Sequence, residues 1–471
     1  MFDVSVDNPA SLDDLFGQVK LAAGLCYQPT VDKAREKSAN IPVKDTLFDS
    51  GHHTTFQHSD SHVSFVLDQI PVSLATFGLH FTHPFYNTSQ RSGRFCTEMF
   101  QPEKRADRSR YITGFISNYM NWPWVISNPR MAEEVIDWVE SGISFFQQQL
   151  PEVTVRAKKA LQDERPNFQG DLDRQASRIA QEQLRNLIST IVPTGMLYTV
   201  NLSTLCSMFL AAWNQPMKVI TKAMLDAVAY HQPKFRPYIS SLSEMRNKNV
   251  RPFEVPLYSK LGYDGEQLTY KPNAILRSAG MSQADLTEAL EAFRETNQYT
   301  PFNLLPFHPS TGYTGEGYRL DADLKMSVAT FGQYQRHRTI TRRDFTVTKE
   351  FYVPPLLQHR TITDFAEKYN HRYWELCRTY GIDKMIHFIP YGSMVRFNAE
   401  ADLKDWYHSI SKRVCLNAQE EFWQVENQLT SSVFWDRDKR PGPPCTNGGK
   451  CREGKRYCGR DIRKSVQRRV I

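Results

Sequence analysis

The sequence lacks a long apolar run. Nowhere in its 471 residues do about 18 apolar residues follow one another, so no membrane-spanning helix and no membrane partner are predicted. The opening MFDVSVDNPASLDD is acidic and has neither the basic start nor the apolar stretch of a secretory signal. We therefore expect a cytoplasmic protein.

Cysteine is too sparse for a disulfide scaffold. The chain has eight cysteines, and a small disulfide-stabilised fold needs a much higher density than this. Five of them stand singly and are expected to be ordinary, mostly buried thiols: Cys26, Cys96, Cys206, Cys377 and Cys415.

Strong charge is also missing, except at one end. The formal net charge is +7, but residues 451–471 alone carry eight Lys and Arg against two acids. The rest of the chain is nearly neutral, which disfavours nucleic acid as a partner. A solvated basic end is the simpler reading of residues 451–471, and contact with nucleic acid or an acidic partner is the alternative.

The same end of the chain carries the other three cysteines, Cys445, Cys451 and Cys458, in the Gly/Pro-rich stretch GPPCTNGGKCREGKRYCG. Three thiols in a short loop predict a structural zinc site that needs a fourth ligand. Their spacing is not that of a CxxC motif, so a free or redox-active cysteine loop stays open as the alternative.

The length predicts two domains, and the order of the expected elements is repeated. In the first half, a helix interrupted near Pro151 covers residues 131–163, and strand-like MLYTV (196–200) leads into a long helix. In the second half, strand-like MVRFNA (394–399) leads into one amphipathic helix over 402–429. A looser, proline-containing stretch lies between the halves. The repeat indicates an internal duplication with domains 1–240 and 241–440, followed by the Cys-containing basic tail 441–471.

The most distinctive stretch is QYQRHRTITRRDF, residues 333–345. Arg336 and Arg338 stay cationic at any working pH and present forked donors that suit phosphate, while the His337 ring can stack or donate. Taken alone, such a stretch is more often a solvated charge cluster at the end of a strand.

This stretch resembles the Arg-His-Arg signature of the flavin-dependent thymidylate synthases, the thymidylate synthase complementing protein family. The segment KDWYHSISKRVCLNAQEEF resembles that family's late helix, which ends in an arginine and an Ala-Gln-x-Glu pattern. In the first half, GHHTTFQHSDSHVSF, YNTSQRSGRF and QLRNLISTIVP resemble further family segments, in the family's order. Together the two resemblances cover most of residues 1–430.

The two halves depart from the family pattern in complementary ways. The first half has Thr82-His83-Pro84 where the Arg-His-Arg belongs, but it keeps the Ser92-Gly93-Arg94 loop and Arg185. The second half keeps the Arg-His-Arg, has a shortened loop after it, and has Ile386 where a nucleotide-contacting arginine belongs. Family sites are assembled between subunits from these two parts. The resemblance therefore implies a tandem-duplicated member whose degenerate halves share one composite site.

The resemblance implies FAD-dependent methylation of dUMP to dTMP, with methylenetetrahydrofolate as one-carbon donor and NADPH as reductant. It implies an α+β fold of two tandem domains, each an antiparallel sheet with packed helices, and a homodimer whose four domains imitate the family tetramer. No side-chain nucleophile is expected, because the cofactor carries the chemistry. The flavin-binding residues it implies are Arg336, His337, Arg338, Lys404, His408, Thr54, Gln57 and His52. The dUMP-binding residues it implies are Ser92, Gly93, Arg94, Arg185, Gln333 and Arg413.

Several alternatives stay open. Asp344 and Gln90 stand where the family usually has glutamate, which allows action on another pyrimidine nucleotide, for example a hydroxymethylation. A noncatalytic protein that binds flavin or nucleotide is a second alternative. The histidine-rich stretch HHTTFQHSDSH also invites a metal interpretation, but it contains no recognised zinc motif.

Overall fold

The computed structural model describes residues 2–12, 16–25, 28–48, 62–80, 86–91, 98–120, 128–212, 215–248, 265–277, 282, 284–285, 319–433, 440–443, 445, 451, 457–460 and 469–471. Across these ranges, no helix has both the length and the apolar character needed to cross a membrane.

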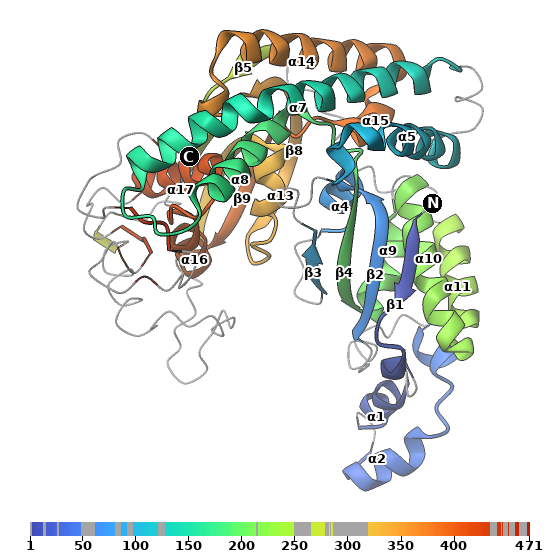
Figure 1. Cartoon of the computed structure of the whole chain (residues 1–471). Coiled ribbons are helices and arrows are strands. Elements are labelled where there is room, and N and C mark those ends of the chain that lie inside the picture. Colours follow the sequence, from blue (N-terminus) through green and yellow to red (C-terminus); the bar gives the residue numbers. More distant parts are fainter. Residues whose placement is uncertain are drawn as a thin grey trace.

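The first half of the chain builds a four-stranded sheet with the order β1-β2-β4-β3 (Figure 1). Neighbouring strands pair antiparallel throughout. Alternate residues of the second strand, such as Val63, Phe65 and Leu67, are fully buried, as expected for a sheet with one face on a core. The strands are β1 (Asp3–Val6), β2 (His62–Pro71), β3 (Tyr86–Gln90) and β4 (Pro193–Asn201). The helices are α1 (Gly17–Leu25), α2 (Val31–Ser38), α4 (Val72–Gly78), α5 (Arg105–Tyr119), α7 (Met131–Glu164), α8 (Leu172–Leu184), α9 (Leu202–Ala211), α10 (Gln215–His231) and α11 (Arg236–Lys248). Short helical turns are η1 (Pro9–Leu12), η2 (Lys44–Phe48), η3 (Glu98–Phe100), η4 (Pro102–Lys104), η5 (Arg185–Leu187) and η6 (Pro233–Phe235).

The second half builds a five-stranded sheet with the order β5-β8-β9-β7-β6. Its pairings are antiparallel, except that the three-residue edge strand β5 runs parallel to β8. The predicted α+β fold class is confirmed. The strands are β5 (Gln267–Thr269), β6 (Asn273–Arg277), β7 (Arg319–Ser327), β8 (Thr341–Tyr352) and β9 (Ser393–Asp402). The helical elements are α13 (Val328–Tyr334), η7 (Pro355–Leu357), α14 (Arg360–Tyr380), α15 (Ile382–Met385), η8 (Ile386–Phe388), α16 (Leu403–Arg413) and α17 (Glu420–Val433).

The two sheets share one arrangement. The neighbours β2-β4-β3 in the first sheet correspond to β7-β9-β8 in the second, and β4 runs directly into α9 as β9 runs into α16. Asn201 and Asp402 are the N-cap residues at these two junctions. Ile386 opens η8 in the position where Arg185 opens η5, as the sequence comparison of the halves predicts. This shared order supports the proposed duplication.

The halves meet at a short stretch of pairing between equivalent residues. Ser189 and Pro390 form an isolated antiparallel bridge. On one side of it the Thr190 amide donates to the Ile389 carbonyl, and on the other side the Tyr391 amide donates to the Ile188 carbonyl, each across 2.9 Å. This reciprocal pattern is the one that a local two-fold relation between the halves produces.

The long helices α7 and α14 lie side by side as a layer over the second sheet (Figure 1). Trp138 of α7 stacks on Tyr369 of α14 at 4.7 Å between ring centroids, and Phe145 stacks on Phe365 at 3.8 Å. Helices α5, α7 and α8 of the first half therefore share one hydrophobic core with the second sheet, while β2, β4, α9 and α10 form the other core.

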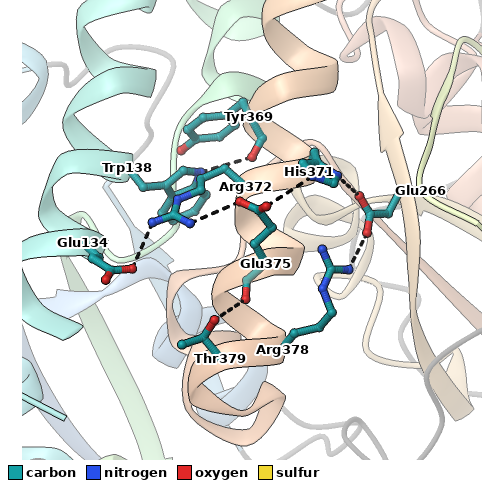
Figure 2. A network of polar contacts seen from close by, with 9 residues as sticks. All are labelled: Glu134, Trp138, Glu266, Tyr369, His371, Arg372, Glu375, Arg378 and Thr379. Carbon is teal, nitrogen blue, oxygen red and sulfur yellow. Dashed lines mark hydrogen bonds and ion pairs between the residues drawn. The ribbon is translucent and has the colours of Figure 1, made fainter. Parts of the chain in front are cut away.

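A polar network borders this helix pair (Figure 2). Arg372 of α14 pairs with Glu134 of α7 at 2.9 Å, and Glu266, just before β5, accepts from His371 and from Arg378 at 2.7 Å each. Loss of solvent opposes the charge of the Glu266 carboxylate, but these two donors hold its pKa below its usual value. The network ties the first half to the second on the outer surface.

Three expected element boundaries are wrong. Helix α7 passes through Pro151 without interruption, since buried Phe146 and Val153 on either side hold the flanking turns in the core and offset the cost of the proline. Helix α11 spans residue 240, where a looser stretch was expected. The helix expected over 402–429 is broken between Arg413 and Glu420.

The end of the basic tail also differs from expectation. Arg469 and Ile471 are buried at 3% and 2% exposed, so residues 469–471 are packed into the protein instead of lying in solvent.

Candidate active site

The Arg-His-Arg segment follows α13 and lies against the first half of the chain. Arg336 donates from Nη2 to the carbonyl of Thr88 at 3.2 Å, and Arg338 donates from Nη2 to Oδ1 of Asn87 at 2.7 Å. Both acceptors lie on β3, and β3 ends two residues before Ser92. The retained motif of the second half thus contacts the strand that leads into the retained loop of the first half.

His337 is enclosed by side chains of α16 and α17. Arg413 donates from Nε to Nε2 of His337 at 3.2 Å, and its guanidinium lies 4.6 Å over the ring of Phe422. The His408 ring lies 6.1 Å from the His337 ring. Burial, together with the charge of Arg413, holds the pKa of His337 well below its usual value. His337 is therefore a neutral ring at neutral pH, with Nε2 as an acceptor.

His80 is a neighbour of this segment that the sequence did not single out. Its Nδ1 lies 2.6 Å from the carbonyl of Ala75 and its Nε2 lies 3.3 Å from Oγ1 of Thr88. Burial lowers its pKa to about 4, and the charges of Arg342, Arg338 and Arg336 act in the same direction. The neutral ring thus donates to the Ala75 carbonyl and accepts from the Thr88 hydroxyl. It therefore holds Thr88, whose carbonyl accepts the hydrogen bond from Arg336.

A second cluster joins Arg185 of the first half to two glutamines of the second. Arg185 is 7% exposed and donates from Nη2 to Oε1 of Gln419 at 2.9 Å. Gln333 donates to the same oxygen from Nε2. The guanidinium of Arg185 also lies 5.7 Å from the centre of the Tyr391 ring. A buried cation and two amide side chains meet here, drawn from α13, η5 and the residue before α17.

The two glutamates after Gln419 anchor the elements that carry these residues. Glu421 accepts the Ser327 amide and the Thr330 hydroxyl, each at 2.6 Å, and so holds the start of α13. Glu420 accepts the Tyr352 hydroxyl at 2.9 Å, and burial raises the pKa of its carboxyl to about 8. The Ala-Gln-Glu-Glu pattern therefore contributes one side chain to the cluster and two that position its framework.

The structure brings six of the predicted residues into these two clusters: Arg336, His337, Arg338, Arg185, Gln333 and Arg413. His408 lies beside His337. Lys404 is on α16, four residues before His408, but its side chain lies outside the described part of the structure, as do His52, Thr54, Gln57, Ser92, Gly93 and Arg94. Two residues of these clusters were not predicted as site residues. Gln419 belongs to the Ala-Gln-x-Glu pattern, but the sequence assigned it no role, and no sequence motif marks His80.

The cysteines of the tail are half-buried and free. Burial raises the pKa of Cys445, and Cys451 and Cys458 act in the same direction. Among the residues that the structure describes, no group of three or more His, Cys, Asp or Glu side chains is arranged to hold a metal ion. The zinc site stays a prediction without structural support.

The first half of the chain matches a known protein family. Residues 12–228 match the family model of the thymidylate synthase complementing protein. This part of the chain belongs to that family. The match includes β3, the Ser92-Gly93-Arg94 loop and Arg185, and it ends before the second sheet begins. The second half shares its order of elements with the first, which agrees with the predicted duplication. A search of curated proteins found no match.

Proposed function

We propose that this protein is a flavin-dependent thymidylate synthase with one composite site, which methylates dUMP to dTMP using methylenetetrahydrofolate and NADPH. The observation that carries the proposal is the contact of Arg336 and Arg338 with β3. It brings the flavin motif, which only the second half retains, beside the strand that leads to the phosphate loop, which only the first half retains.

The residues present fit a flavin adenine dinucleotide at the Arg-His-Arg segment. Arg336 is exposed and Arg338 is half-buried, and the forked N–H donors of a guanidinium suit the oxygens of a diphosphate. The neutral His337 adds a ring without an opposing charge. When bound, the flavin would supply the hydride that completes the methyl group on C5 of dUMP, after its own reduction by NADPH.

The cluster of Arg185, Gln333 and Gln419 fits the nucleotide. The buried Arg185 places positive charge where water is scarce, which strengthens its attraction for a phosphate or for negative charge on a pyrimidine ring. Amide side chains offer both donors and acceptors, as the edge of a uracil ring requires. In this proposal these residues bind and orient dUMP, and Ser92 and Arg94 complete the phosphate contacts.

The proposal includes a homodimer in the cytoplasm. In this proposal the contact between the halves at Ser189 and Pro390 corresponds to one subunit interface of a family tetramer. Two chains then build the same four-domain assembly. The cofactors are FAD, with NADPH and methylenetetrahydrofolate as co-substrates, and zinc in the tail remains a separate proposal.

The test is the visible spectrum and the dUMP turnover of the purified chain. We expect flavin absorption bands, FAD bound at up to one per composite site, and conversion of dUMP to dTMP that depends on methylenetetrahydrofolate and NADPH. Arg336→Gln should lose FAD, and the control Arg360→Gln should not, because the Arg360 side chain is 92% exposed on α14. A colourless protein that cannot be reconstituted with FAD would overturn the proposal.

A further inference from the structure

The loop between α16 and α17, residues 414–419, presents Gln419 to Arg185 and Gln333. The apolar spacing of the sequence favours a continuous helix here, so something outside the loop must hold it in its bent form. Within the loop, the Ala418 amide donates to the Cys415 carbonyl at 2.9 Å. That single turn leaves the carbonyls of Leu416 and Ala418 to be satisfied by other partners.

Two arginines from distant parts of the chain supply those partners. Arg165, immediately after α7, donates from Nη2 to the Leu416 carbonyl at 2.9 Å. Arg469 donates from Nη2 to the Leu416 carbonyl at 2.8 Å and to the Ala418 carbonyl at 2.5 Å. Both side chains are at least 95% buried. Neither residue belongs to any motif of the proposed site.

Arg469 is itself held in place. The Val470 amide donates to Oε1 of Glu164 at 2.7 Å, and the Val470 carbonyl accepts from Nε2 of Gln183 at 2.8 Å. Ile471 is part of the core beneath. The guanidinium of Arg469 lies 5.8 Å from the centre of the Trp423 ring on α17. Residues 469–471 therefore fill a fixed place between α7, α8 and α17.

This arrangement is costly if stability is its only purpose. Two like charges are buried side by side, and burial, helped by the charge of Arg165, lowers the pKa of Arg469 to about 10, although the charges of Glu420, Glu182 and Glu164 act in the opposite direction. Within the described part of the chain, Nη1 of Arg469 and Nε of Arg165 have no hydrogen-bond acceptor. Apolar side chains of similar size would fill the same space without that cost. Apolar side chains could not, however, donate hydrogen bonds to the carbonyls of Leu416 and Ala418.

We propose that Arg469, together with Arg165, is a positioning residue of the substrate site. By fixing the Leu416 and Ala418 carbonyls, it sets the direction in which Gln419 leaves the loop, and so the place where Arg185 and Gln333 meet. The inference rests on the proposed function only in taking that meeting point as the dUMP site. The hold of Arg469 on the loop is independent of what binds there.

Hydrogen exchange of the full-length protein tests the hold on the loop. In Arg469→Met, which keeps the size of the side chain, peptides that cover residues 414–423 should exchange at least about tenfold faster, and α10 should be unchanged. A chain ending at residue 468 should behave in the same way, and Arg469→Lys should lie between this variant and the wild type. Unchanged exchange at 414–423 in Arg469→Met would overturn the proposal.

Titration with dUMP tests the consequence for the site. Arg469→Met should bind dUMP about tenfold or more weakly with unchanged FAD content, while the exposed control Arg360→Met should match the wild type. Equal dUMP affinity in a variant whose loop is loosened would show that the loop does not position the site. If the wild-type chain binds no dUMP, the proposed function fails, and the exchange measurement alone decides whether Arg469 holds the loop.

Discussion

Arg338 in the second half of the chain donates from Nη2 to Oδ1 of Asn87 in the first half across 2.7 Å. The contact joins the end of one retained motif to the strand before the other. With the Thr88 contact of Arg336, it fixes the Arg-His-Arg segment against β3. The position of the Arg-His-Arg segment therefore depends on contacts between the two halves as well as on the motif itself.

Asn87→Ala should therefore weaken FAD binding although Asn87 belongs to no flavin motif. The lost hydrogen bond involves a charged donor but is exposed to solvent, so we expect about 0.5 to 1.5 kcal/mol, roughly a two- to tenfold loss of affinity. Fluorescence titration with FAD measures it. The neighbouring Ser89→Ala, on the exposed side of the same strand, should leave the affinity unchanged, and equal losses in both variants would contradict a specific role for Asn87.

Arg185→Gln should weaken dUMP binding and spare FAD. The variant removes a buried charge at the glutamine cluster, which should cost about 1.5 to 3 kcal/mol, or roughly ten- to 150-fold in affinity. Calorimetric titration with dUMP gives the affinity, and the flavin absorption of the same sample reports FAD. Loss of FAD with an unchanged dUMP affinity would mean that Arg185 binds FAD and not dUMP, which would contradict the assignment.

The pH dependence of stability should show the buried histidine His387. It is 6% exposed, and burial lowers its pKa from 6.5 to about 4. Below about pH 6.5 the unfolded chain takes up a proton that the folded protein refuses until about pH 4. Stability is therefore full above pH 6.5 and falls as the pH drops toward 4, by up to about 3 kcal/mol for this group.

Urea denaturation at pH 7.5 and at pH 5 measures this effect. His387→Gln has no titrating ring at this position, so its stability should fall less between the two pH values than that of the wild type. His80, whose pKa is lowered in the same direction, keeps part of the dependence in the variant. An identical pH dependence in wild type and variant would mean that His387 titrates normally in the folded protein.

Removing one partner of the buried ion pair between Arg108 and Glu140 should destabilise the fold strongly, and removing both partners should destabilise it much less. Arg108 donates from Nε and Nη2 to the two carboxylate oxygens of Glu140 at 2.7 and 2.6 Å, and both side chains are buried. Arg108→Ala leaves a buried carboxylate and should cost about 3 to 5 kcal/mol. The double variant Arg108→Met, Glu140→Leu should recover much of that loss in urea denaturation, and equal losses in the single and double variants would contradict the argument.

Most residues of the two candidate clusters stand out in the sequence, but the contacts between them could not be predicted from it. Arg336, His337 and Arg338 form a contiguous motif, and Arg185 and Ile386 stand in matching places of two repeated segments, so local order is enough to find them. His80 acts through Thr88 and Ala75, and no pattern in the sequence marks those contacts.

The break in the late helix shows why local patterns fail elsewhere. The apolar spacing from Leu403 to Leu429 is helical throughout, yet the helix breaks where Arg165 and Arg469, from distant positions in the chain, donate to the carbonyls of Leu416 and Ala418. Helix propensity and amphipathic spacing describe only neighbours in sequence. The same long-range packing carries α7 through Pro151 and buries Arg469 in a tail whose composition predicts solvent exposure.

The most direct test of the composite site is the activity of a mixture of two inactive variants. Arg185→Gln alters only the first half and Arg336→Gln only the second, and each alone should lose conversion of dUMP to dTMP. Because Arg336 contacts β3 of its own chain, we expect the mixture, refolded together to allow exchange of chains, to stay inactive. Full activity of Arg185→Gln alone, or restored activity in the mixture, would contradict a single site shared by the two halves of one chain.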